Sequence, residues 1–131
     1  MPFPTSEEFI SEEERRLGAG LPATFRAYLS ESNGGEVEVL EDVWQVFPVF
    51  DSSERKRSAR TANHLFRERD VSRSWGGFPI DALPFADCGS GDRLVFLLES
   101  ETKYGEAVYL WSHEQRNLEK LAESFNQLVA G

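Results

Sequence analysis

Cysteine is nearly absent from the sequence: Cys88 is the only one among 131 residues. A lone thiol excludes an intrachain disulfide and any metal site built from several cysteines. Because disulfides are typical of oxidising compartments, this scarcity favours a reducing environment. We therefore expect a cytoplasmic protein whose fold depends on packing alone.

Long hydrophobic stretches are missing as well. The longest apolar run, Leu94–Leu98, is far shorter than the roughly 20 residues that a membrane-spanning helix requires. The N-terminal residues 1–8 are acidic and contain no apolar stretch, which argues against a signal peptide. We expect no association with membranes.

Positive charge is scarce. The chain carries 14 Lys and Arg against 23 Asp and Glu, for a formal net charge of −9. Such a field repels nucleic acids and anionic membranes and attracts basic proteins. A high negative charge also simply keeps proteins soluble, so net charge alone leaves both interpretations open.

Half of the basic residues lie in one segment, between positions 55 and 73. A nucleic-acid patch is typically interleaved with aromatic side chains from strands, and this segment lacks that pattern. We interpret it as a solvated helix face that pairs with acidic residues elsewhere, and we expect no nucleic-acid binding. Ser52–Ser74 is also the part of the chain that we expect to be most mobile.

Apolar residues are plentiful, at 40% of the chain, and include ten Phe, three Trp and three Tyr. That is enough to fill the core of one domain, and the length matches one domain. No repeat or linker interrupts the sequence. We predict a single domain over residues 1–131.

Two short helices are predicted near the N-terminus. Thr5 and Glu8 form a capping box for the first helix, which extends to about Leu17. The second helix begins at Pro22, a residue that suits the first turn, and ends at the turn formed by residues 32–35.

The middle of the chain predicts a sheet. Alternation and apolar runs predict strands at Glu36–Val39, Trp44–Val49, Leu83–Ala86, Arg93–Leu98 and Glu106–Trp111. The continuous apolar run at Arg93–Leu98 indicates a central strand that is buried on both faces.

Two further helices complete the prediction. One starts after Asp51–Glu54 and extends to about Arg67, and the last follows the apolar stripe from Leu118 to Val129. The order of elements predicts an α+β fold, with a mixed or mostly antiparallel central sheet packed by helices from both ends of the chain.

The turn at residues 87–92 is the first candidate for chemistry, because two glycines lie between Asp87 and Asp92. Such a turn could bind a cation or hold a basic side chain of a partner. The alternative is a tight loop whose carboxylates cap its own backbone. We favour the loop, since the spacing of calcium-binding loops is absent.

Histidine and cysteine offer little more. His113 and Glu114 follow a strand but point to opposite faces, so we predict a solvated turn. We place His64 on the surface, and Cys88 lies among acids rather than in the electropositive setting of a reactive thiol. We predict no catalytic, metal-binding or cofactor-binding residues. A small metal-dependent hydrolase using Asp87, Asp92 and His113 is the least favoured hypothesis.

Three blocks of the sequence resemble the SMI1/KNR4 family of the SUKH superfamily. They are ERRLGAGLPATFRAYL at 14–29 with SNGG at 32–35, LPFADCGSGD at 83–92, and VYLWSHE at 108–114 with the helix through Phe125. Cys88 stands where the family commonly has a polar or acidic residue, and Ser112 where it commonly has Asp. These departures weaken an acidic site at those two positions and leave the fold expectation intact.

The resemblance implies an α+β domain that binds proteins and is not an enzyme. Bacterial members are similar to immunity proteins, which neutralise a cognate toxin, often a nuclease, by direct binding. Fungal members act as regulators of cell-wall synthesis and as scaffolds, which is the alternative function. We expect a basic toxin as the partner, no cofactor, and a monomer or weak homodimer.

Exposed acids beside aromatic side chains suit a basic partner. We predict the partner-binding residues to be Asp87, Asp92, Glu36, Glu38, Trp44 and Trp111. The alternative for the two tryptophans is that both belong to the core.

Overall fold

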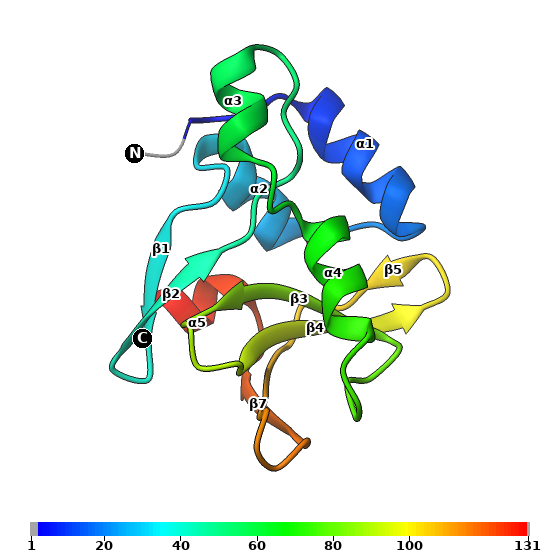
Figure 1. Cartoon of the computed structure of the whole chain (residues 1–131), viewed down its shortest axis with the longest axis vertical. Coiled ribbons are helices and arrows are strands. Elements are labelled where there is room, and N and C mark those ends of the chain that lie inside the picture. The colour runs from blue at the N-terminus through cyan, green and yellow to red at the C-terminus, as the bar shows by residue number, and fades with distance from the viewer. Residues whose placement is uncertain (1–2, 131) are drawn as a thin grey trace.

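The computed structural model describes residues 3–130, with the side chain of residue 130 left aside (Figure 1). Its elements are α1 (Glu7–Leu17), α2 (Ala23–Glu31), β1 (Glu36–Val39), β2 (Asp42–Val46), α3 (Arg55–Arg60), α4 (Leu65–Arg73), β3 (Ala82–Asp87), β4 (Arg93–Ser100), β5 (Lys103–Tyr104), β6 (Val108–Trp111), β7 (Leu118–Ala122) and α5 (Phe125–Ala130).

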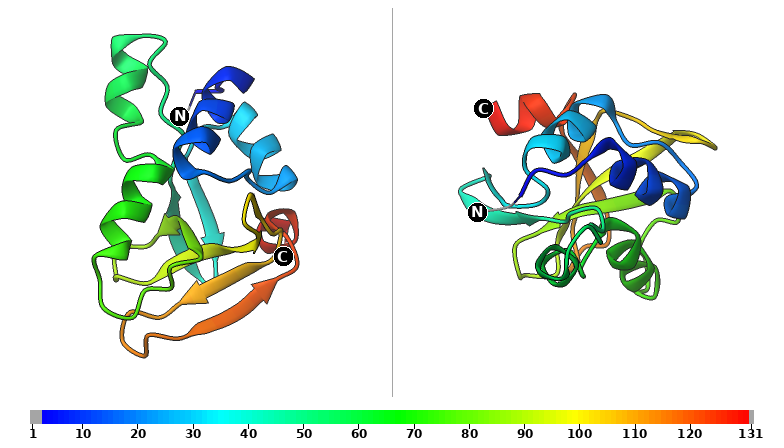
Figure 2. Two further views of the ribbon diagram at one scale, coloured as in Figure 1. Left: turned by 90° about the vertical axis from the view of Figure 1, so that its right-hand side faces the viewer. Right: turned by 90° about the horizontal axis from the view of Figure 1, so that it is seen from above.

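One antiparallel sheet organises the fold. Its strands are ordered β1-β2-β3-β4-β6-β7, and the short β5 pairs with β4 away from this path. The sheet curls, with α4 on one face and α1, α2 and α5 on the other (Figure 2). The predicted α+β class is confirmed, and β1 and β7 are the two edges of the path.

The main core lies between the sheet and the helices α1, α2 and α5. Phe25 of α2 is its centre, with ring centroids 5.2 Å from Phe85, Phe96 and Phe125. A second, smaller cluster forms on the opposite face around Trp111. Arg93–Phe96 is buried, which confirms the predicted central strand in its first half.

The start of α1 differs from the prediction. Ser6 is the N-cap residue, and the Oγ1 of Thr5 instead donates a hydrogen bond to Asp51 at 3.0 Å. Glu8 is exposed on the first turn. The capping box is therefore wrong, because a buried acid 46 positions away competes for the Thr5 hydroxyl.

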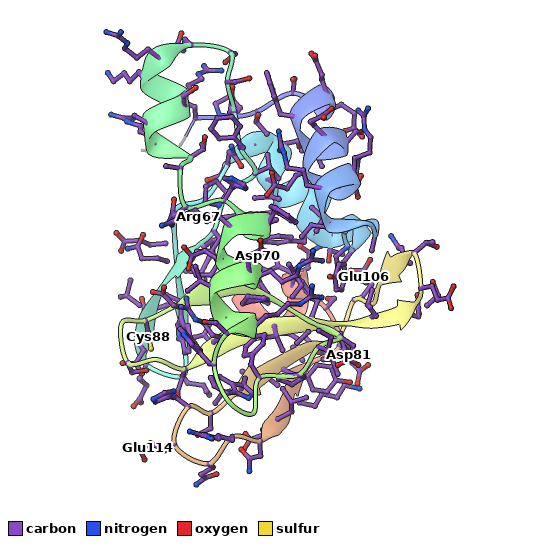
Figure 3. All side chains as sticks on the ribbon, turned by 45° about the vertical axis from the view of Figure 1, so that its right-hand side comes forward. Arg67, Asp70, Asp81, Cys88, Glu106 and Glu114 are labelled. Atoms are coloured by element: carbon purple, nitrogen blue, oxygen red, sulfur yellow. The ribbon has the colours of Figure 1, made fainter. Side chains whose placement is uncertain are left out.

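Helix α2 is capped from a distant part of the chain. Its own N-cap, Pro22, makes no side-chain hydrogen bond. Glu106 lies at this helix end (Figure 3), where its carboxylate accepts hydrogen bonds from the N–H of Ala23 at 2.8 Å and from the hydroxyl of Thr24. A carboxylate at this end satisfies a free N–H and complements the helix dipole.

The predicted third helix is two helices, α3 and α4. Helix α3 ends where Thr61 donates its hydroxyl to the Arg57 carbonyl and accepts the N–H of Asp51. Helix α4 then starts at Leu65, which is fully buried, and also buries Arg69. Arg69 can be buried there because its guanidinium donates hydrogen bonds to the Leu17 carbonyl and the Tyr104 hydroxyl.

The predicted C-terminal helix is wrong in its first half. Leu118–Ala122 forms β7, and only Phe125–Ala130 is helical. The register against β6 skips one residue, which places Leu121 as an extra residue in β7. Because of this bulge, Leu121 and Ala122 both face the main core. Two adjacent apolar residues three and four positions after Leu118 have the spacing expected of a helix.

Candidate functional site

The acids of the β3–β4 turn are held by the protein itself. Asp87 accepts a hydrogen bond from Arg93 Nη1 at 2.8 Å, and Asp92 accepts the backbone N–H of His113 at 2.8 Å. The imidazole of His113 instead packs edge-on against Trp75, with ring centroids 6.1 Å apart. These contacts are those of a structural loop.

Asp87, Asp92 and His113, the residues of the hydrolase hypothesis, each have partners within the domain. In residues 3–130, no group of three or more His, Cys, Asp or Glu side chains is placed to hold a metal ion. Cys88 in the same turn is half-buried, and its sulfur lies 3.2 Å from the hydroxyl of Ser90 (Figure 3).

Both tryptophans of the predicted interface lie in the interior, as the alternative held. Trp44 is 2% exposed and donates its indole N–H to the Val39 carbonyl at 3.1 Å. Trp111 is fully buried, with Trp75 stacked against it and Phe78 edge-on. A side chain without exposed surface cannot anchor a partner, so the expectation for Trp44 and Trp111 is corrected.

Glu36 and Glu38 lie on the outer face of the β1–β2 hairpin, residues 36–46, which we call the acidic hairpin. Glu36 pairs with Gln45 and Glu38 with Val43, and all four side chains are exposed. The alternate residues of both strands face the core. Helix α3 adjoins the Glu36 end of this face, where Arg57 and Arg60 line one groove with Glu36 and Gln45. Val43, toward the other end, is 52% exposed.

The tip of the acidic hairpin has a strained backbone and exposes one apolar side chain. Leu40 and Glu41 form its two-residue turn with φ angles of 54° and 68°, in the left-handed region. Such a turn favours Asn-Gly, and each residue with a larger side chain costs about 1–2 kcal/mol there. Leu40 is 60% exposed, at a loop that projects from the molecule (Figure 1). Strain retained at an exposed apolar residue points to a functional role.

The acids of the acidic hairpin have no salt-bridge partner among the described residues, although Glu36 lines one groove with Arg57 and Arg60 of α3. These acids are Glu36, Glu38, Glu41 and Asp42. No Lys, Arg or His lies between Arg26 and Arg55 in the sequence. The acids of α1 differ, since Glu12, Glu13 and Glu14 each pair with an arginine.

A groove of about 500 Å³ adjoins each end of β1. The first lies between β1 and α3, where the guanidinium groups of Arg57 and Arg60 lie over the Phe3 ring. The second lies between the hairpin tip, β7 and α5. It is lined by Leu40 and Leu128 and bordered by Glu38 and Glu41.

A family model described as the SMI1/KNR4 family (SUKH-1) matches residues 4–131. The chain belongs to this family. The predicted resemblance is therefore confirmed over nearly the whole chain. No curated protein was found to match it. None of the helices in residues 3–130 is long and apolar enough to cross a membrane.

This SMI1/KNR4 domain also contains a buried carboxylate that sequence reasoning missed. Glu13 of α1 is fully buried and accepts hydrogen bonds from His64 Nδ1 at 2.7 Å, from Arg16, and from the N–H groups of Phe50 and Phe66. Burial tends to raise the pKa of this carboxyl, but the hydrogen bonds and the charge of His64 outweigh it and lower the pKa.

Glu13 therefore joins α1 to the segment between β2 and α4. His64, expected on the surface, is partly buried against this carboxylate. In sequence, Glu13 is one of three consecutive glutamates, and its residue type does not distinguish it from the partly exposed Glu12. Its position on the inner side of α1, next to Ile10 and Leu17, was the only available signal.

Proposed function

We propose that this protein is a cytoplasmic immunity protein that neutralises a basic toxin by binding it through the acidic hairpin. Membership of the SMI1/KNR4 family supports a protein-binding role. The observation that supports the proposal is a set of acids without ion pairs in the described chain, beside the exposed side chains of Leu40 and Val43.

The two kinds of side chain on the acidic hairpin supply different parts of the binding. Unpaired carboxylates steer a basic partner and accelerate association, and this effect weakens as salt is added. Leu40 and Val43 supply apolar area that leaves water in the complex, which slows dissociation. Enzymes that act on nucleic acids carry basic surfaces, so a toxin of that class fits both requirements.

The direct test is a complex with the toxin encoded beside this gene. We expect the two proteins to co-purify and the toxin to lose activity in the complex. A triple variant, Glu36→Gln/Glu38→Gln/Glu41→Gln, should slow association about tenfold or more at low salt.

The matched control changes the net charge equally but elsewhere, with Glu99→Gln/Glu101→Gln/Glu114→Gln. All three control residues are exposed. We expect association within about twofold to threefold of the wild type, since distant exposed charges are largely screened. Equal slowing by both triple variants would contradict the assignment to the acidic hairpin. No complex with the neighbouring toxin, or no toxin gene nearby, would favour the regulatory alternative.

A further inference from the structure

Strand β1 is an open edge of the sheet. It pairs with β2 and with no other strand of the described chain. Just before β1, the N–H of Val46 donates to the Gly35 carbonyl at 2.8 Å, so this pair is hydrogen-bonded across the ladder. Hydrogen-bonded and non-bonded pairs alternate in an antiparallel ladder. The N–H and C=O groups of Glu36 and Glu38 therefore point away from β2, toward the open edge.

The two edges of the sheet differ in how they are protected. Natural edge strands discourage pairing by being short, or by carrying charged side chains (especially Lys), Pro or a bulge. The opposite edge, β7, has both Lys120 and the bulge at Leu121. Strand β1 is short and carries charge, but it has no Lys, Pro or bulge within Glu36–Val39, and its charged side chains are the acids Glu36 and Glu38.

The acidic side chains also determine what can pair with this edge. A second copy of the chain would bring its own Glu36 and Glu38 beside the same residues, and facing like charges destabilise a strand pair. A strand with Lys or Arg at the matching positions would gain favourable cross-strand pairs instead.

The other face of an added strand would meet apolar side chains. The groove beside β1 is lined on this side by Val39, Leu40 and Leu128. Because side chains alternate along a strand, every second residue of the added strand would face this groove.

We propose that β1 binds its partner by strand addition, and that the added strand alternates basic and apolar residues. This inference rests on the proposed function, since it describes how the acidic hairpin holds the basic protein. Backbone hydrogen bonds to Glu36 and Glu38 supply affinity, and the alternating side chains supply specificity.

A proline substitution separates the backbone from the charge. Glu38→Pro removes one outward N–H and the carboxylate, whereas Glu38→Gln removes the carboxylate alone. We expect the Glu38→Pro variant to bind the neighbouring toxin about tenfold or more weakly than Glu38→Gln, because a partner carbonyl loses its donor. The control pair, Lys120→Pro and Lys120→Gln on exposed β7, should differ by less than about threefold.

A second measurement keeps the inference testable if Glu38→Pro fails to fold. A short peptide of alternating lysine and valine is titrated into the wild-type protein and followed by NMR. We expect shifts of the Glu36 and Glu38 amides and slower exchange of their protons with solvent. A peptide of equal composition with all lysines before all valines should give neither effect.

The outcomes distinguish the two proposals. Equal affinity of Glu38→Pro and Glu38→Gln for the toxin would overturn strand addition while leaving the immunity function standing. Equal effects of the two peptides on these amides, or no effect of either, would overturn it as well. The absence of any toxin complex would overturn the proposed function, and the peptide titration would then test the β1 edge alone.

Discussion

Replacing Glu13 by Gln is expected to be severely destabilising. The substitution keeps the shape of the side chain but removes the charge that four donors face; these donors are Arg16, His64 and the N–H groups of Phe50 and Phe66. One amide oxygen cannot accept all four hydrogen bonds, and the new NH₂ group faces other donors.

The magnitude follows from the burial of Glu13, which is 0% exposed. Removing one partner of a buried, hydrogen-bonded charge pair costs about 3–5 kcal/mol. A domain of this size is stable by about 5–15 kcal/mol, so the loss is a large fraction of the total. The melting temperature should fall by about 10–20 °C, measured by circular dichroism alongside urea unfolding.

The neighbouring residue supplies a matched control. Glu12 pairs with Arg15 at 2.8 Å, but the two side chains are 43% and 72% exposed. Exposed pairs of this kind contribute little, so Glu12→Gln should change the free energy of unfolding by less than about 0.5 kcal/mol. If Glu12→Gln and Glu13→Gln lowered the free energy of unfolding by similar amounts, burial would not be what makes the Glu13 contacts stabilising.

Acid should reproduce part of the same loss in the wild-type protein. The pKa of Glu13 is lower in the folded protein than in the unfolded chain, so its contribution is fully present above the unfolded value of about 4.3. It is lost as the pH falls through the lowered folded value. The free energy of unfolding should therefore fall more steeply below about pH 4.3 in the wild type than in Glu13→Gln.

Three further predictions concern single contacts. Replacing Leu40 and Glu41 by Asn and Gly should relieve the turn and stabilise the protein by about 1–3 kcal/mol in urea unfolding, while weakening toxin binding because Leu40 is lost; an unchanged stability would contradict the strain. Glu106→Gln should lower the free energy of unfolding by about 0.5–2 kcal/mol, because the cap at the start of α2 is weakened. An unchanged melting curve would show that Glu106 does not stabilise this helix end. Gly91→Ala should destabilise by about 1–3 kcal/mol, since φ is 99° and the new Cβ would lie 3.1 Å from the His113 ring; a neutral effect would contradict that geometry.

Local patterns in the sequence predicted the parts of the fold that local interactions determine. The first helix ends at Leu17 as predicted, where Gly18 follows with a φ of 76°, and the apolar run after Arg93 is the central strand. The family resemblance was carried by such local blocks.

The prediction missed features that depend on contacts with another segment of the chain. Leu118–Ala122 has helical spacing, but pairing with β6 and a bulge at Leu121 make it a strand. Thr5 has the sequence of a helix cap, but Asp51 takes its hydroxyl. In both cases a contact with another segment outweighed the preference of the segment itself.

The candidate site was predictable only where a local sequence pattern determines it. The alternation at Glu36–Val39 identified an exposed acidic strand face, and its partner-binding role remains a prediction. The pairing of Asp87 with Arg93 and the burial of Trp111 under Trp75 depend on how the sheet is covered, which no local pattern records.

Amide hydrogen exchange of the protein, free and bound to the neighbouring toxin, tests the role of the acidic hairpin most directly. We predict that complex formation slows exchange over residues 36–42, with the largest effects at the outward-facing amides of Glu36 and Glu38. A complex that protects another surface and leaves these amides exchanging as in the free protein would contradict the account.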